Sequence, residues 1–413
     1  MTRGGVLAVG LAATVLVSSR CAAESVLEKG EKDYRKGWVT DAEVVMQPLV
    51  EKKDKDYPRY LLSLGSVELS LGDYWRAGQY FTAAVQNLSV ELGSFATGVA
   101  LFRAEKNRPY RGYPHEKVLA HTYLGLAYFQ QNKYNDARIE FAKAREEERG
   151  TTEAQRSDFA TSEFLDGVNA LRAGRFNDAQ VSFRKITELK KDWPLGWFSL
   201  CRASYLNHDD GEAAEAWARY ESLSDSASRL ARDGSTPCAL FLIATGWGPT
   251  READSLGLCR WERTPSAEKD VRLAVAGQPR LDAVAVDDLY NEASTSGGVV
   301  GQVARKLVSL PLRALFASAK SDSTKSDKLD LKSDADVRSW DISPGTIHLA
   351  ALPIPPSPST VEITCFDDKG RAIDADRRAL RFIGGQPFDR SPIIYVRVLP
   401  NPGERAVTHD RKH

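Results

Sequence analysis

The spacing of apolar residues divides the chain into a helical first part and a strand-rich second part. Between Val118 and Ala144, apolar residues recur at steps of three and four, which is the spacing of amphipathic helices. The pattern breaks at 132–134, so this stretch predicts two helices joined as a hairpin. The hairpin fits the 34-residue tetratricopeptide pattern, whose large and small positions are taken in order by Leu124, Gly125, Tyr128, Ala137, Phe141 and Ala144.

The same offsets return in four other stretches. A first unit that matches the repeat pattern less well covers 24–54, and a clearer second unit covers 58–89. After an insertion at 90–117 and the central hairpin, two further units repeat in phase, because Gly167, Ala179 and Phe183 are followed 34 residues later by Cys201, Ala213 and Trp217. About five hairpins from 24 to 222 predict an all-α, right-handed superhelix in which each repeat packs on its neighbours.

The period changes after residue 222. A polar linker is expected at 223–238, followed by a smaller β-rich domain at 239–400 that resembles a sandwich. One helix at 301–319, a mobile polar loop at 321–334 and a disordered tail at 401–413 complete the prediction. A continuous apolar run predicts a buried strand at 239–245, and period-two alternation predicts strands at 271–276 and 281–286. Further strand-like runs bring the total to about seven, at 347–352, 361–366, 380–383 and 393–399. The fold class expected is therefore α+β with more than one domain.

The first 23 residues have the pattern of a secretory signal peptide. Arg3 precedes an uncharged apolar run at 4–19, and small residues at 21–23 suit a cut before Glu24. The run is shorter than the roughly 18 to 20 residues that span a bilayer, which disfavours a retained anchor. We expect an exported protein, periplasmic or associated with a bacterial cell envelope. Lipid attachment at Cys21 is a less favoured alternative, because Arg20 stands where a small residue is required, and it is the one expected route to a membrane.

The charge content bears on the kind of partner, and the cysteine content bears on disulfide bonding. Basic and acidic residues both number 56, so no net field draws the chain to nucleic acid. In an oxidising compartment, Cys238 and Cys259 are candidates for a disulfide, and two buried thiols are an equal alternative. Cys201 occupies a core position of the fifth repeat.

Signatures of catalysis and of metal binding are absent from the sequence. His115-Glu116 and His121 resemble a zinc-protease helix, but that site needs its histidines four apart, and here they are six apart. Exposed or capping side chains are the simpler interpretation. We predict no catalytic residue, no cofactor and no metal, and hence a protein that is not an enzyme.

The first helix of each tetratricopeptide hairpin lines the concave groove, which predicts a protein-binding surface. Large apolar groups in that groove suggest that something covers them, either a partner's segment or this chain's own C-terminal domain or 299–319 helix. A register error, which would make these residues core, is a further alternative. The predicted groove residues are Leu62, Phe129, Phe164, Val168, Phe198, Arg202 and Tyr205.

Several motifs, taken in order, resemble those of a known family. They are Tyr110–Lys117 leading into His121–Tyr128, the run Ala239–Pro249 that ends in Gly-Trp-Gly-Pro, and Asp336–Trp340 followed by Pro344–Ile347. This series is similar to an uncharacterised bacterial cell-envelope family, often lipoproteins, with tetratricopeptide repeats and a β-rich C-terminal domain. The resemblance implies export and no established catalytic residues.

The hypothesis that follows is a non-enzymatic, exported scaffold or adaptor that binds another cell-envelope protein through its tetratricopeptide groove. One alternative is an envelope enzyme with its site in the β-rich domain, near Arg338, Trp340 and Asp341. Another is a structural protein whose groove is filled by its own C-terminal domain.

Overall fold

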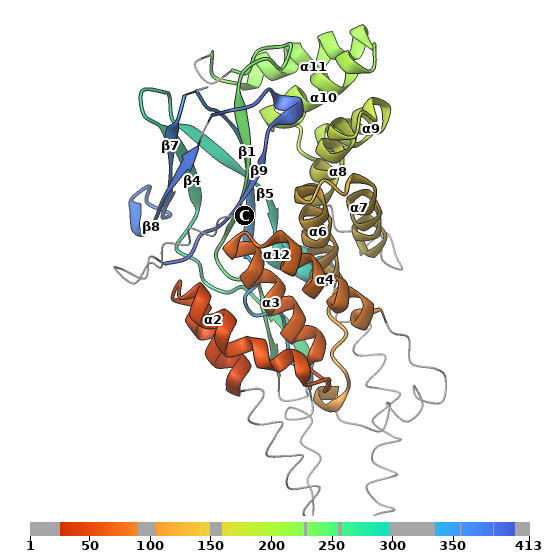
Figure 1. The fold of residues 1–413 in the computed structure, drawn as a ribbon, viewed down its shortest axis with the longest axis vertical. Helices are drawn as coiled ribbons and strands as arrows, with labels where there is room; N and C mark the ends of the chain where they lie inside the picture. The colour runs from red at the N-terminus through yellow and green to blue at the C-terminus, as the bar shows by residue number, and fades with distance from the viewer. Residues whose placement is uncertain are drawn as a thin grey trace, which may run out of the picture.

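The computed structural model describes residues 25–89, 105–148, 159–226, 229–254, 258–296, 335–355, 357–382 and 384–400. The predicted signal peptide with Cys21, the helix at 301–319, the loop at 321–334 and the tail at 401–413 lie outside these ranges. Within them, helices fill the N-terminal part and strands fill the C-terminal part, so the expected fold class is confirmed (Figure 1).

Ten helices form the five predicted hairpins in the part of the chain that the structure describes. The first helices of the hairpins are a helix at 25–35, α3 (Tyr57–Leu71), α6 (Pro114–Gln130), α8 (Ala160–Arg172) and α10 (Pro194–Leu206). The second helices are α2 (Val39–Met46), α4 (Tyr74–Leu88), α7 (Tyr134–Glu148), α9 (Phe176–Leu189) and α11 (Asp210–Leu223). A 3-10 turn, η1 (Gln47–Glu51), extends α2, and a second, η2 (Glu105–Asn107), precedes α6.

Each hairpin closes around a small residue of its first helix. A Cβ atom added to Gly125 would lie 2.5 Å from Cε1 of Phe141, which is too close for an ordinary contact. The same relation joins Gly65 to Phe81 and Gly167 to Phe183. The glycine lets the aromatic ring of the second helix lie against the backbone of the first, which is why the small and large positions recur together in the sequence.

A seven-stranded sheet and a separate two-stranded hairpin make up the C-terminal domain. The seven strands predicted from the sequence are confirmed, and they lie in the order β8-β7-β4-β5-β6-β1-β9. All neighbours are antiparallel except β1 and β9, which are parallel. The sheet strands are β1 (Cys238–Thr245), β4 (Asp270–Val275), β5 (Leu281–Asp288), β6 (Thr346–Pro353), β7 (Ser359–Phe366), β8 (Ala372–Phe382) and β9 (Ile393–Arg397).

Several short elements were not predicted. The hairpin of β2 (Thr250–Ala253) and β3 (Cys259–Glu262) is short, and its side chains do not alternate clearly between apolar and polar. The helix α12 (Leu289–Ser296) follows β5 directly, and the turn η5 (Phe388–Arg390) precedes β9.

Strand β1 is buried on both faces, which explains its continuous apolar sequence. Phe241 and Ile243 point into an apolar core enclosed by the sheet, together with Val271 and Ile363 from other strands. Leu240 and its alternate neighbours point the opposite way, into a larger core shared with the helical array. The sheet thus packs on the array with one face and encloses its own core with the other.

None of the helices among the described residues is both long enough and apolar enough to cross a membrane.

Candidate functional site: the concave face of the array

The concave face of the helical array is occupied by the C-terminal domain. Figure 1 shows the helices following one another in chain order along one side of the sheet, with α6 and α8 nearer to it than α7 and α9. Two segments of the C-terminal domain make the polar contacts with the first helices of the repeats: the loop at 335–343 and the segment at 384–400. Strand β5 adds Asp287, which accepts three hydrogen bonds from the start of α8.

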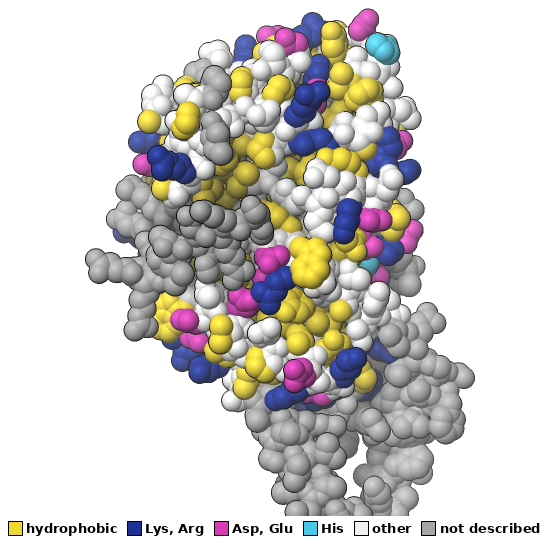
Figure 2. All heavy atoms as spheres, in the orientation of Figure 1, with side chains coloured by type: hydrophobic (Ala, Val, Ile, Leu, Met, Phe, Trp, Pro, Cys, Tyr) yellow, Lys and Arg dark blue, Asp and Glu magenta, His cyan; other side chains and the backbone are white. Residues whose placement is uncertain are grey.

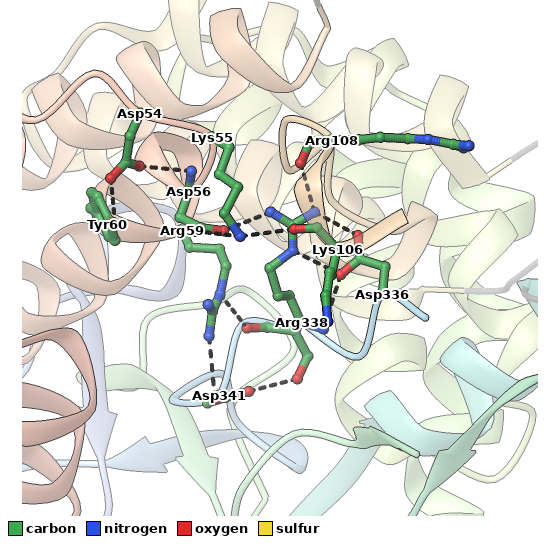
Figure 3. Close-up of polar contacts among 11 residues, drawn as sticks. Asp54, Lys55, Asp56, Arg59, Tyr60, Lys106, Arg108, Asp336, Arg338 and Asp341 are labelled. Carbon is green, nitrogen blue, oxygen red and sulfur yellow. Dashed lines mark hydrogen bonds and ion pairs between the residues drawn. The ribbon is translucent and has the colours of Figure 1, made fainter. Parts of the chain in front are cut away.

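The loop at 335–343 is held by buried charges at the N-terminal end of the array (Figure 3). The Arg338 guanidinium lies 2.6 Å from the Asp56 carboxylate and donates to the Arg108 carbonyl at 2.8 Å. Arg59 donates to the Ser339 carbonyl at 3.1 Å and lies 3.4 Å from the Asp341 carboxylate. Because Arg338, Asp56 and Arg59 are all buried, removal of one partner would leave a charge without compensation.

Glu116, in the first turn of α6, binds the backbone of Trp340 in the same loop. Its carboxylate accepts from the Trp340 backbone N–H at 2.6 Å and from the Tyr113 N–H at 2.8 Å, and the Tyr110 hydroxyl also donates to it. The contact with Tyr113 caps the start of α6, so Glu116 joins a helix terminus to the other domain. Burial raises the pKa of Glu116 to about 7, although these three donors oppose the rise.

A second buried carboxyl lies nearby in the first repeat. Glu31 accepts a hydrogen bond from the Ser63 hydroxyl at 3.1 Å. Burial, with the charge of Asp341, raises the pKa of Glu31 to about 7, and Arg59 and Ser63 act in the opposite direction. In the same repeat, Arg35 donates to the Asp341 carbonyl at 2.7 Å.

The helix α8 is attached to the C-terminal domain at both ends. At its start, the Asp287 carboxylate of β5 accepts from the backbone N–H groups of Ala160 and Thr161, each at 2.8 Å, and from the Thr161 hydroxyl. The first N–H groups of a helix have no partner within the helix, so Asp287 caps α8 from another domain. At the other end, Arg172 donates to the Ser391 carbonyl at 2.6 Å.

The third and fifth repeats hold the segment at 384–400. Gln130 of α6 donates to the Ile393 carbonyl at 2.5 Å. Arg202 of α10 contacts both oxygens of Asp389, with Nε to Oδ1 at 2.9 Å and Nη2 to Oδ2 at 2.5 Å. All five first helices therefore contribute at least one polar contact to the C-terminal domain.

Of the predicted groove residues, two face the C-terminal domain in contacts that the structure specifies. Arg202 pairs with Asp389, and the ring of Phe198 lies 4.9 Å from that of Phe388 between centroids, edge to face. Tyr205 lies at the margin with 49% of its surface exposed and the Arg202 guanidinium 5.5 Å from its ring centre.

The other predicted groove residues, Leu62, Phe129, Phe164 and Val168, are buried. Phe164 packs between helices, with its ring centre 5.7 Å from that of Phe183 and 5.1 Å from that of Trp193. Phe164 is therefore a core residue of the array, which is the alternative that a register error would produce. Whether any of these residues binds another protein stays a prediction.

The structure bears on the cysteines and on the two histidines. Cys238 and Cys259 are both buried and are not bonded to each other, with Cys238 beside the Ser391 hydroxyl at 3.0 Å and Cys259 beside the Asp336 carbonyl at 3.5 Å. These are the two buried thiols of the alternative, and their different neighbours hold them apart. His115 and His121 were expected to be exposed or capping, but both are buried. The His115 ring lies edge to face against Trp261 at 4.8 Å, and the His121 Nδ1 lies 2.7 Å from a Glu140 carboxylate oxygen.

The residues named for the enzyme alternative all lie at the interface. Arg338 and Trp340 are buried against the array, and Asp341 is bound by Arg59. The charged groups of Arg338 and Asp341 are paired with residues of the array, and the Trp340 Nε1 is buried with no hydrogen-bond partner among the described residues. The roles of Asp287, Glu116 and Arg172 in joining the domains could not be predicted from the sequence, because each bonds to a segment more than 100 residues away.

The outer surface of the array is mixed in charge. On the face shown in Figure 2, basic and acidic side chains are interspersed, as expected from equal numbers of each. Ile139 of α7 and Val181 of α9 occupy equivalent positions in neighbouring repeats, and they are 52% and 55% exposed.

These features define a class of protein: an array of tetratricopeptide-like hairpins whose groove is filled by a β-domain of the same chain. No family model matches the chain, and no curated protein matches it. Among solved structures, the chain is similar to MamA. A crystal structure of the MamA protein shares 15% identity and covers 49% of this chain and 91% of MamA, with a TM-score of 0.37. MamA from residue 41 to its end, from Desulfovibrio magneticus RS-1, shares 16% identity and covers 49% of this chain and 94% of its own, with a TM-score of 0.37. A likeness at this level does not identify a function.

Proposed function

We propose that this protein is a non-enzymatic, exported scaffold of the bacterial cell envelope that holds its own C-terminal domain in its groove and presents the joined body to another envelope protein. The proposal combines the signal-peptide pattern of the first 23 residues with the occupied concave face. Tetratricopeptide arrays recognise proteins through extended concave surfaces, and here that surface already has a protein ligand in the same chain.

The observation that carries the proposal is the continuity of this internal contact. Each of the five repeats contributes a hydrogen bond or ion pair, and aromatic pairs such as Phe198 with Phe388 lie between them. A partner could enter the groove only by displacing the loop at 335–343 or the segment at 384–400, and the latter includes β9, a strand of the sheet. We therefore place the contact with the partner on the outer face, where Ile139 and Val181 are exposed.

Site-specific photocrosslinking of the full-length protein in cells tests this proposal. A photoreactive residue at Val181 or Ile139 reports on the outer face, and one at Tyr205 reports on the margin of the groove. We expect the outer positions to form a discrete crosslink to a second envelope protein, and Tyr205 to form crosslinks within the chain only.

Two results would contradict the proposal in different ways. A crosslink from Tyr205 to another envelope protein, with none from the outer face, would favour the groove adaptor that the sequence first suggested. Fractionation that finds the tagged protein in the cytoplasm would remove the envelope assignment and leave the internal contact unaffected.

A further inference from the structure

Strand β5 pairs with β4 along its first half and with β6 along its second half, and a wedge-shaped gap lies where the partner changes. Its first half pairs with β4, with Ala283 opposite Val271. Its second half pairs with β6, with Val284 opposite Leu349. The β5–β6 ladder stops there, so from Ala350 onward β6 is paired on one side only among the described strands.

A hollow of about 320 Å³ lies in this wedge, between the sheet and the last repeat of the array. Eleven of its fifteen lining residues are apolar in type and seven are buried, and Val284, at 36% exposure, lies toward the opening. We call this hollow the wedge pocket, and its buried apolar lining includes Trp193, Leu195, Tyr220, Leu230, Leu349 and Ala351.

Four polar residues line the pocket, namely Ser224, Asp225, Arg280 and Asp282. The Tyr220 hydroxyl accepts from the Leu230 N–H at 2.8 Å, and Asp282 is paired with Arg272 at 2.7 Å. Arg280 also lines the pocket, is exposed, and makes no ion pair with any residue that the structure describes. The pocket thus combines an apolar interior with an unpaired cation at its mouth.

A second hollow, lined by the other end of β5, differs in chemistry. It measures about 530 Å³ and is lined by charged residues of both signs, of which Arg263 pairs with Asp288 at 2.7 Å. Arg263 also covers the Tyr290 ring, at 4.5 Å from its centre. This second hollow is therefore lined by more charged residues than the wedge pocket.

We propose that the wedge pocket binds an anionic amphiphile, with an unbranched apolar chain against the buried walls and an anionic head group at Arg280. Ligand pockets are lined mainly by apolar residues and favour junctions between domains, and the wedge pocket lies at such a junction with eleven apolar residues among its fifteen lining residues. Its volume holds roughly ten methylene-sized groups at about 30 Å³ each, which matches a chain of medium length. An apolar hollow left empty is unfavourable, whereas an apolar chain placed there leaves water.

Calorimetric titration of the full-length protein with decanoate is the first test. Decanol tests the chain without its charge, and acetate tests the charge without its chain. We expect saturable binding of decanoate at one site, weaker binding of decanol and none of acetate. Saturation by acetate, or no saturable binding of decanoate, would overturn the proposal.

Two variants locate the site. Arg280→Gln should weaken decanoate binding about threefold to fivefold, the effect of an exposed ion pair, and leave decanol binding unchanged. Arg260→Gln, an exposed arginine of β3, is the matched control and should bind decanoate as the wild type does. Ala351→Leu should fill the pocket and abolish binding of both ligands. Equal decanoate affinity in all the variants would place the site elsewhere and refute the proposal.

The head group could belong to a free fatty acid or to an anionic phospholipid. Sedimentation with phosphatidylglycerol vesicles that is lost in Arg280→Gln would identify the lipid as the source. Decanoate binding without sedimentation would identify the free acid. Displacement of decanoate by an extended apolar peptide that carries no negative charge would instead show that the free edge of β6 accepts a strand, and would overturn the amphiphile.

Discussion

At the scale of single residues, the small side chain in the middle of each first helix determines how closely a hairpin can close. Replacement of Gly125 by alanine should cost about 1 to 3 kcal/mol in the free energy of unfolding, because the new methyl group overlaps the Phe141 ring. Urea unfolding measures this cost. Gly211→Ala is the control, since a Cβ atom there meets its nearest neighbour at 3.7 Å and should be neutral or slightly stabilising. Equal stability of the two variants would contradict the packing described.

Buried carboxyls should make the stability of the protein depend on pH. The pKa of Glu31 is raised from 4.5 to about 7, so the folded state retains a proton that the unfolded state releases. Its contribution is present in full below pH 4.5 and is lost as the pH rises to about 7, by at most about 3 kcal/mol. The effect of Glu31 is the difference in free energy of unfolding between the wild type and Glu31→Gln. This comparison is needed because buried His115 and His348, with their pKa values lowered to about 3 and about 4, make stability rise with pH instead.

The measurement is the free energy of unfolding of the wild type and of Glu31→Gln between pH 5 and pH 8. We expect the advantage of the wild type over the variant to shrink as the pH rises. Glu28→Gln, at an exposed position of the same helix, is the matched control. A difference that stays constant across this range would show that Glu31 does not titrate there.

At the scale of elements, α8 depends on a cap that comes from another domain. Loss of an N-cap costs about 1 kcal/mol and at most about 2, and Asp287 accepts three hydrogen bonds at this helix start. We expect Asp287→Ala to destabilise the protein by at least that amount and to raise amide hydrogen exchange in the first turn of α8. Asp73→Ala, which removes the cap of α4 within the array, should raise exchange in α4 alone. Unchanged exchange at the start of α8 would argue against the cap.

The elements themselves could largely be predicted from the sequence, because their signals are local. The periods of the helices and of the seven sheet strands are set by which face each residue buries. The hairpin of β2 and β3 escaped prediction, since its residues are half exposed and do not alternate. The site could be predicted only in part, because Arg202 and Phe198 lie at a repeat position that faces inward, whereas their partners Asp389 and Phe388 carry no periodic signal.

At the scale of the whole molecule, the two domains share one apolar core. Residues of the array and of one face of the sheet belong to a single buried cluster, so neither domain can lose the other without exposing apolar surface. We expect the wild type to unfold in one cooperative transition by calorimetry. Combining Arg202→Ala with Arg338→Ala removes charges at both ends of the interface and should separate the transition into two. Two transitions in the wild type would show that the domains are only loosely joined.

The parallel pairing of β9 with β1 also dictates the order in which the molecule can be assembled. Ala244 and Arg397 are neighbours in the sheet but lie 153 positions apart in the chain. During synthesis the array emerges first, and the strand that fills its groove emerges last among the described elements. A long loop must therefore close before the groove is covered, which makes this step slow. Until then the nascent protein carries an open, apolar groove. Chaperone binding and aggregation are both most favoured during this interval, because the groove is exposed.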